Sequence, residues 1–441
     1  FDARETEVEP IKAAFLNQTK VIWFQLAAND DPVAAFTRLN VGKIPLTNDE
    51  LIRALFLRRP SETQDSQNDL QLRIAHEWDL VEKTLQNDAF WYFISNEKSA
   101  SENRIGYVFR LLADSDGMDK LEANDAYGVF YHFSRRLNSE AADPELEWRR
   151  AKQKFMTLEE WFNDRNLFHI VGFLIHDGVS INEIARIAHN ITKDQFERLL
   201  RDRIFTSLFG PIPNPLTIDA IEESVSDALE SLQYQRHASK IRSVLLLFNI
   251  ATLLENPRSN IRFQFDSFKE GSWDIEHVRS VSPDNLNTVA LRAAWLDELL
   301  GYLSSQNAEP ELCEDIREFL GLPNPKSRVD EFNRLYERLV GFFNESTQPE
   351  PDHRVSNLVL LDDGTNRSYK NAVFALKRQR LLLLDRAGIF VPLCTRNVFL
   401  KCYSERVEHV MFWQESDRES YAKAMASTIS RFFMGNTEAI R

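Results

Sequence analysis

Glycine, cysteine and long apolar runs are scarce in this sequence. Its 441 residues include only 14 glycines and three cysteines, Cys313, Cys394 and Cys402, which show no Cys-x-x-Cys spacing. An odd number of isolated cysteines argues against a disulfide framework or a zinc site, so we expect a reducing, cytoplasmic location. No run of 18 apolar residues and no signal peptide is visible, so we expect no membrane partner.

Positive charge is scarce as well. The net charge is −14 and the isoelectric point is about 5.3. This balance argues against a body coated with basic surface for non-specific DNA binding, but it leaves room for a local basic groove. Phenylalanine, by contrast, is abundant, with 31 residues. Together with the few glycines, the phenylalanines predict large helical cores rather than a glycine-rich sheet protein.

Helical periodicity dominates the region from about 65 to 255. Four large apolar residues follow each other at the spacing of one helix face: Leu70, Ile74, Trp78 and Val81. The polar residues of this region form no recognisable cluster, so we expect it to be almost entirely α-helical and to supply no catalytic residue. Before it, Thr47 and Glu50 predict the capped start of a helix, and residues 21–24 predict a strand.

The pattern changes after Pro257. Apolar and polar residues alternate around Ile261, Phe263 and Phe265, which predicts a half-buried strand. Four further segments follow: an extended piece over 273–278, helices over 285–344, a strand over 355–361 and a basic helix from about 368 to 384.

The extended segments and the last helix carry a set of polar residues: Glu276, His277, Asn357, Asn366 and Asn371. A neutral histidine can deprotonate a water molecule for attack on phosphorus. Carboxylate and amide oxygens can hold a divalent metal, Mg²⁺ or Mn²⁺, that stabilises the developing charge. The set therefore predicts a metal-dependent nuclease centre, with His277 as the base and Glu276 and Asn366 as metal ligands.

The same residues resemble the HNH ββα-metal motif, and more closely the C-terminal domain of GmrSD-type restriction endonucleases. The family's motif ends in a helix reading Asn-x4-Asn-x2-Phe-x2-Lys-Arg, which is matched by Asn366, Asn371, Phe374, Lys377 and Arg378. A later Trp-x3-Asp-Arg-x2-Tyr segment is matched by Trp413, Asp417, Arg418 and Tyr421.

The N-terminal part resembles the ParB-like regulatory domain of the same family, through the stretch from Phe36 to Thr47. That domain carries an Asp-Gly-Gln-Gln-Arg motif that implies nucleotide binding or hydrolysis, and the motif does not occur in this sequence. The chain begins at Phe1 rather than Met, so we expect the motif upstream of it. A nucleotide (NTP) cofactor, bound through that upstream part, therefore stays one of the possibilities.

Positive charge gathers beside the expected centre. Residues 366–401 contain eight lysines and arginines against one acidic residue, Asp385. A basic run is ordinarily a solvated face, but next to a nuclease centre we expect DNA contacts from four residues: Lys377 and Arg378 first, then Lys370 and Asn371. Asn357 has two interpretations, a place in the catalytic centre or a tie across the loop between the strands. We favour the tie over metal ligation.

We therefore predict a mainly α fold with a small α+β part. Residues 1–60 would be the remnant of a ParB-like α/β domain, 61–255 a helical domain, and 256–441 a ββα-metal (HNH) domain with a helical insertion at 285–344. The resemblance implies a DNA endonuclease of a prokaryotic restriction or anti-phage defence system that acts on modified or foreign DNA. The alternative is a non-catalytic DNA-binding or regulatory subunit, and RNA as the substrate and a homo-oligomer are left open.

Overall fold

The computed structural model describes most of the chain from residue 46 onward: residues 46–58, 65–97, 103–118, 124–139, 142–271, 273–279, 286, 288–322, 329–343, 352–362, 372–407 and 410–435, with 12, 13, 16, 17 and 19 before them. The strand expected over 21–24, most of the ParB-like stretch, and the site residues Asn366, Lys370 and Asn371 lie outside this part. Within the described residues helices dominate, and the expected mainly α fold is confirmed.

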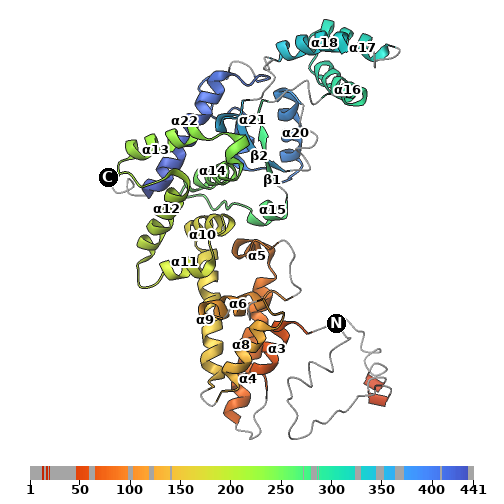
Figure 1. Cartoon of the computed structure of the whole chain (residues 1–441). Coiled ribbons are helices and arrows are strands. Elements are labelled where there is room, and N and C mark those ends of the chain that lie inside the picture. Colours follow the sequence, from red (N-terminus) through yellow and green to blue (C-terminus); the bar gives the residue numbers. More distant parts are fainter. Residues whose placement is uncertain are drawn as a thin grey trace.

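The lower half of the molecule in Figure 1 is a helical bundle made of α3 (Asn48–Phe56), α4 (Asp65–Leu85), α5 (Asp88–Ile94), α6 (Gly106–Ser115), α8 (Gly128–Leu137) and α9 (Pro144–Asn163). The capping box at the start of α3 is confirmed, because the Thr47 backbone N–H donates to the Glu50 carboxylate at 2.8 Å. Aromatic rings fill the bundle, as where Trp78 stacks on Trp148 with centroids 5.7 Å apart. Since α3 packs on α6 and α8, it belongs to this bundle.

The chain continues through α10 (Arg165–His176), α11 (Ile181–Ile187), α12 (Lys193–Phe209), α13 (Ile218–Ser231), α14 (Tyr234–Leu254) and α15 (Phe265–Glu270). Several of these helices start at a capping side chain, as at Asp164, Ser180 and Thr192. Apart from one isolated bridge at Gln233, no strand occurs between residues 65 and 250 where the chain is described. The predicted helical middle region is therefore confirmed.

The strand predicted around Ile261 to Phe265 is wrong. This segment is extended, but no described strand pairs with it, and α15 begins at Phe265. Its backbone binds a side chain instead: the Phe263 N–H donates to Nε2 of His169 on α10 at 3.0 Å. Phe263 and Phe265 are buried whereas Ile261 is exposed, so the alternation belongs to an extended strip that lies on helices.

A two-stranded antiparallel sheet lies in the C-terminal region. β1 (Trp273–His277) pairs with β2 (Leu358–Asp362), and the 3-10 turn η3 (Val355–Asn357) comes just before β2. Three helices follow: α20 (Phe374–Arg386), α21 (Leu393–Phe399) and α22 (Glu415–Met434). The extended segment expected over 273–278 and a strand close to the one expected over 355–361 are thus confirmed.

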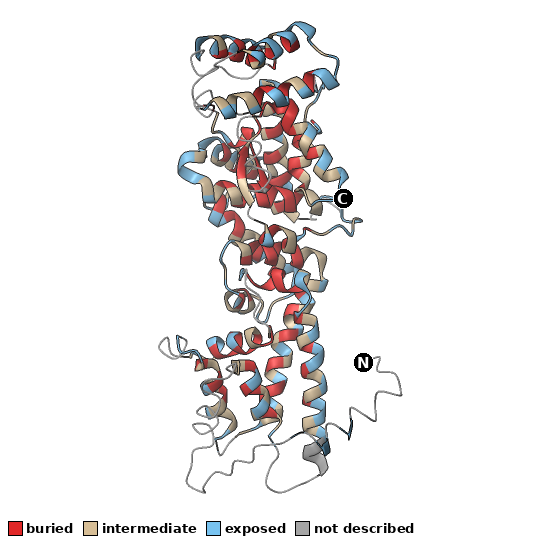
Figure 2. Cartoon of the chain, turned by 90° about the vertical axis from the view of Figure 1, so that its right-hand side faces the viewer, coloured by how far each residue is buried: buried red, intermediate tan, exposed pale blue. Residues whose placement is uncertain are grey.

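One hydrophobic core extends from the first bundle through the sheet to α22, and Figure 2 shows buried residues along the length of the molecule. α22 packs on both α13 and α14. The core is therefore continuous across residue 256, where the sequence suggested a domain boundary.

The segment between β1 and β2 forms a helical module of α16 (Val289–Ser305), α17 (Pro310–Gly321) and α18 (Val329–Phe342). The module has a second core, built around Trp295, Leu299 and Phe332. Val373 and Leu376, at the start of α20, belong to this second core. The insertion therefore covers one side of α20.

Candidate functional site

The last two residues of β1 are Glu276 and His277, and adjacent strand residues point to opposite faces of a sheet. Glu276 is buried and meets Lys377 of α20. The half-buried His277 meets the first residue of α14, Tyr234, with ring centroids 5.2 Å apart. The sheet thus separates a carboxylate side, at α20, from an imidazole side, at α14.

On the carboxylate side Lys377 forms a buried ion pair. Its Nζ lies 2.5 Å from Oε1 of Glu276 and donates to the backbone carbonyl of His277 at 2.6 Å. The Lys377 side chain is fully buried and that of Glu276 is 7% exposed. The sequence assigned Lys377 to DNA phosphate; the structure places it inside the protein, where it fastens α20 to β1.

On the imidazole side, two histidines and an amide form a chain of contacts. Nε2 of His277 lies 3.1 Å from Nδ1 of His353, and Nε2 of His353 lies 3.0 Å from the side-chain amide of Gln235 on α14. The Tyr234 backbone N–H also donates to the carbonyl of His353 at 3.1 Å. Neither His353 nor Gln235 lies in a sequence motif, and they meet only through the fold, so the sequence gives no signal for either residue.

Two proton arrangements fit this chain. In one, the Gln235 amide is turned by 180° from its orientation in the structure, so that its carbonyl oxygen accepts from Nε2 of His353, and His277 carries its proton on Nε2 and donates it to Nδ1 of His353. In the other, which matches the orientation of the Gln235 amide in the structure, the Gln235 N–H donates to Nε2 of His353, Nδ1 of His353 donates to Nε2 of His277, and the proton of His277 sits on Nδ1. Nδ1 makes no hydrogen bond to any residue that the structure describes, so the first arrangement leaves it as an open acceptor.

Burial lowers the pKa of His277 to about 3, and the positive charge of Lys377 and the neighbouring His353 act in the same direction. The carboxylate of Asp352 opposes this shift. His277 is therefore neutral at physiological pH, which is the state that a general base requires.

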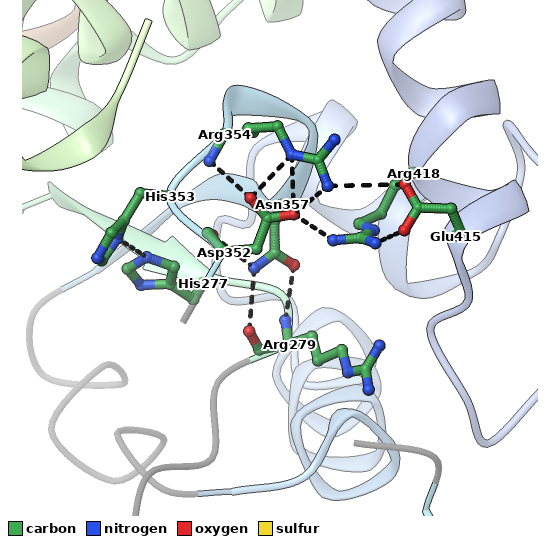
Figure 3. A network of polar contacts seen from close by, with 8 residues as sticks. All are labelled: His277, Arg279, Asp352, His353, Arg354, Asn357, Glu415 and Arg418. Atoms are coloured by element: carbon green, nitrogen blue, oxygen red, sulfur yellow. Dashed lines mark hydrogen bonds and ion pairs between the residues drawn. The ribbon is translucent and has the colours of Figure 1, made fainter. Parts of the chain in front are cut away.

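Asn357 ties together the ends of the two strands. Its Oδ1 accepts from the Arg279 backbone N–H at 3.1 Å, and its Nδ2 donates to the carbonyls of Arg279 and Asp352, each at 3.0 Å. Figure 3 shows this amide between the two segments. Because all three contacts go to backbone, the geometry supports the loop-tying role that was favoured over metal ligation.

A charged network surrounds Asp352 on the far side of this tie (Figure 3). Arg354 donates to its carboxylate from Nε at 3.0 Å, and Arg418 of α22 donates to the same carboxylate and pairs with Glu415. Burial alone would raise the pKa of Asp352, but the hydrogen bonds from Arg354 and the charges of both arginines outweigh it and hold the pKa below its usual value. The network fixes the loop that carries His353.

The remaining expected DNA contact in the described chain is Arg378. It is half-buried on α20, and its charge acts on Tyr302 of the insertion. The next cation on this helix, Arg380, forms an ion pair with Glu298 of α16. The start of α20 is thus enclosed by the insertion rather than open to a ligand.

The HNH resemblance implies a divalent metal held by Glu276 and Asn366. In the described parts of the chain, no three His, Cys, Asp or Glu side chains gather closely enough to hold a metal ion. The Glu276 carboxylate already faces an ammonium group, which competes for its oxygen and repels a second cation. The described residues therefore do not fit a metal site by themselves.

Comparison of the chain with protein-family models, with curated proteins and with solved structures returns no match. Of the helices that the structure describes, none combines the length and apolar character needed to cross a membrane.

Proposed function

We propose that this protein is a metal-dependent DNA endonuclease of a prokaryotic restriction or anti-phage defence system, as the resemblance in its sequence implies. The histidine pair is the observation that carries the proposal. His277 is neutral, its Nε2 contacts His353, and its Nδ1 has no hydrogen-bond partner among the residues that the structure describes. The antiparallel strand pair that leads into α20, with Asn357 tying the strand ends, supports the same assignment.

In the arrangement that serves hydrolysis, the proton of His277 is on Nε2. Nδ1 then takes a proton from a water molecule while the water oxygen attacks phosphorus. The bond between phosphorus and the leaving sugar oxygen breaks, and that oxygen takes up a proton from solvent. An imidazole with a pKa of about 3 is a weak base, but the negative phosphodiester beside it raises this pKa and strengthens the base during attack.

Plasmid cleavage tests the proposal. Supercoiled DNA, with and without modified bases, is incubated with Mg²⁺, Mn²⁺ or EDTA, and nicked and linear products are measured over time. We expect cleavage that depends on metal and falls by roughly 10²–10⁴ in His277→Ala, the usual contribution of a general base. Cleavage by His277→Ala at the parent rate, or none by the parent protein with either metal, contradicts the proposal.

A non-catalytic DNA-binding subunit is the second candidate, and the ion pair between Glu276 and Lys377 favours it, because a neutralised carboxylate is a poor metal ligand. The same assay separates the two. Salt-dependent DNA binding without cleavage under any metal condition identifies the binding subunit. A labelled RNA duplex in parallel tests the sugar preference.

A further inference from the structure

The first half of α14 holds a group of exposed positive charges that the sequence analysis did not single out. Arg236 is exposed, and Lys240 and Arg242 are half-buried at the surface. The helix contains no acidic residue from Tyr234 to Leu254. This half of α14 is therefore a cationic surface on a protein whose net charge is −14.

The charges on α14 are poorly neutralised by the protein. Arg236 and Lys240 form no ion pair with any residue that the structure describes. Arg242 pairs with Asp274 at 3.3 Å, but both side chains are more than a third exposed, at 39% and 44%. Exposed pairs of this kind are weak and exchange readily for other partners. Arg236 and Lys240 are thus open to an external anion, and Arg242 is already partly neutralised.

The cations lie beside the proposed catalytic histidine. Tyr234 contacts the His277 ring, and Gln235 contacts His353. Arg236 is the next residue of the chain after Gln235. The backbone of α14 is kinked at His237, between Arg236 and Lys240. Arg242, two residues after Lys240, lies on another face of the helix and meets Asp274 of β1. Figure 1 shows α14 next to β1 and β2, and α14 contacts both strands.

The pocket between α13 and α22 is a less suitable place for an anion. It has a volume of about 640 Å³ and is lined by three cations and four carboxylates: Arg354, Arg418 and Lys423 against Glu222, Glu230, Glu415 and Glu419. A polyanion would meet as much repulsion as attraction there.

We infer that the first half of α14 is the surface on which the phosphate backbone of double-stranded DNA docks, through Arg236 and Lys240. The inference rests on the proposed function and names the substrate-binding surface of the same centre. The start of this surface adjoins the histidine pair, through the contacts of Tyr234 with His277 and of Gln235 with His353. The contacts are to phosphate, so they give affinity and orientation but no sequence preference.

Fluorescence anisotropy with a labelled DNA duplex in EDTA tests the inference without cleavage. The double variant Arg236→Ala/Lys240→Ala is compared with the parent and with Lys83→Ala/Arg198→Ala, a control that removes the same charge from exposed positions on α4 and α12. Each lost phosphate contact lowers the slope of log affinity against log salt by about 0.9, so the α14 variant should lose about 1.8 in slope and on the order of 50-fold in affinity at 0.1 M salt. The control should bind like the parent.

The outcomes separate the surface from the chemistry. Parent-like binding by the α14 variant, or equal losses in the variant and the control, overturns the docking surface and leaves the nuclease proposal intact. Loss of binding specific to the α14 variant, in a protein that cleaves nothing with metal, supports the surface and removes the nuclease. Tighter binding of an RNA duplex by the parent overturns DNA as the ligand. Circular dichroism of each variant checks that the fold is kept.

Discussion

Two basic helices, α14 and α20, flank the small sheet of this protein, and they use their charges in opposite ways. On α20, Lys377 is buried against Glu276, and Arg380 pairs with Glu298 of the insertion. On α14, Arg236 and Lys240 have no ion-pair partner in the described chain. Lys377 and Arg380 of α20 hold the protein together, whereas Arg236 and Lys240 of α14 are available to a ligand.

The difference follows from what packs on each helix. The inserted module between the strands packs on the start of α20 and supplies Glu298 as the partner of Arg380. The main hydrophobic core buries Phe374 of the same helix. The start of α14 contacts the loop of His353 and the end of β1, and none of the described residues brings a carboxylate to Arg236 or Lys240. Net charge in a sequence therefore predicts binding only when burial and pairing are known as well.

Lys377→Ala should give the largest effect on stability. It leaves the Glu276 carboxylate buried without a counter-charge, which costs about 3–5 kcal/mol of unfolding free energy. Arg236→Ala on α14 is the matched control and should change this free energy by less than about 0.5 kcal/mol. Urea unfolding followed by circular dichroism measures both.

A rescue variant sharpens the result. Replacing both partners, Lys377→Met with Glu276→Leu, removes the uncompensated charge and should recover most of the stability lost in Lys377→Ala. If Lys377→Ala keeps the parent stability and instead lowers the salt slope of DNA binding, the phosphate contact expected from the sequence is correct and the comparison between the helices fails.

The buried, neutral side chain of His169 should make the unfolding free energy of the protein depend on pH in the acid range. Burial lowers the pKa of His169 to about 4, against about 6.5 in the unfolded chain. Below pH 6.5 His169 binds a proton in the unfolded chain but not in the folded protein. The unfolding free energy therefore falls as the pH drops from 6.5 toward 4, and above pH 6.5 this residue has no effect on it. Between pH 7.5 and pH 5 this residue should account for about 2 kcal/mol of lost stability.

The measurement is the difference in unfolding free energy between pH 7.5 and pH 5, compared with that of His169→Gln. The variant is less stable at pH 7.5, since glutamine cannot replace both hydrogen bonds of the ring, to the Arg165 carbonyl and from the Phe263 N–H. Its dependence on pH should nevertheless be shallower. Equal pH dependence in the two proteins would show that His169 does not titrate as argued.

Local sequence signals predicted the elements of this fold well, because each depends on neighbours in the chain. The capped start of α3, the helical middle region and the short strands near 273–278 and 358–362 are present as expected. The strand predicted around Ile261 was wrong because two buried phenylalanines two residues apart also fit an extended segment that packs on helices. The backbone partner of this segment is the side chain of His169. Alternation alone does not reveal what covers a segment.

The candidate centre was only partly predictable. His277, Glu276 and Asn357 could be named because they lie in a spaced motif, and the structure brings all three to the strand ends. His353 and Gln235 are separated by 118 positions in the chain, so no local pattern links them. The burial of Lys377 was equally invisible, because it depends on the insertion and the sheet enclosing α20 together.

The histidine contact predicts a moderate kinetic effect. His353→Ala removes the partner that orients His277, and kcat should fall on the order of 10-fold with little change in KM, the lower end of what losing an orienting partner costs. His353→Asn keeps an acceptor near the position of Nδ1 and should recover part of this loss. The pH profile of kcat should shift in the alanine variant only. If both variants lose the same activity with unchanged pH profiles, His353 has a purely structural role.

The smallest effect should come from the cations of α20 that remain unpaired in the described chain. Arg378 lies beside the insertion, and Arg386 is in the last turn of α20, the helix that meets Glu276 on the carboxylate side of the sheet. Since the inferred docking surface is on α14, Arg378→Ala/Arg386→Ala should lower the salt slope of DNA binding by well under the roughly 1.8 expected for two lost phosphate contacts. The same anisotropy titrations measure it. A slope change equal to that of the α14 variant would mean that DNA contacts both sides of the sheet, and the functional distinction between the two helices would no longer hold.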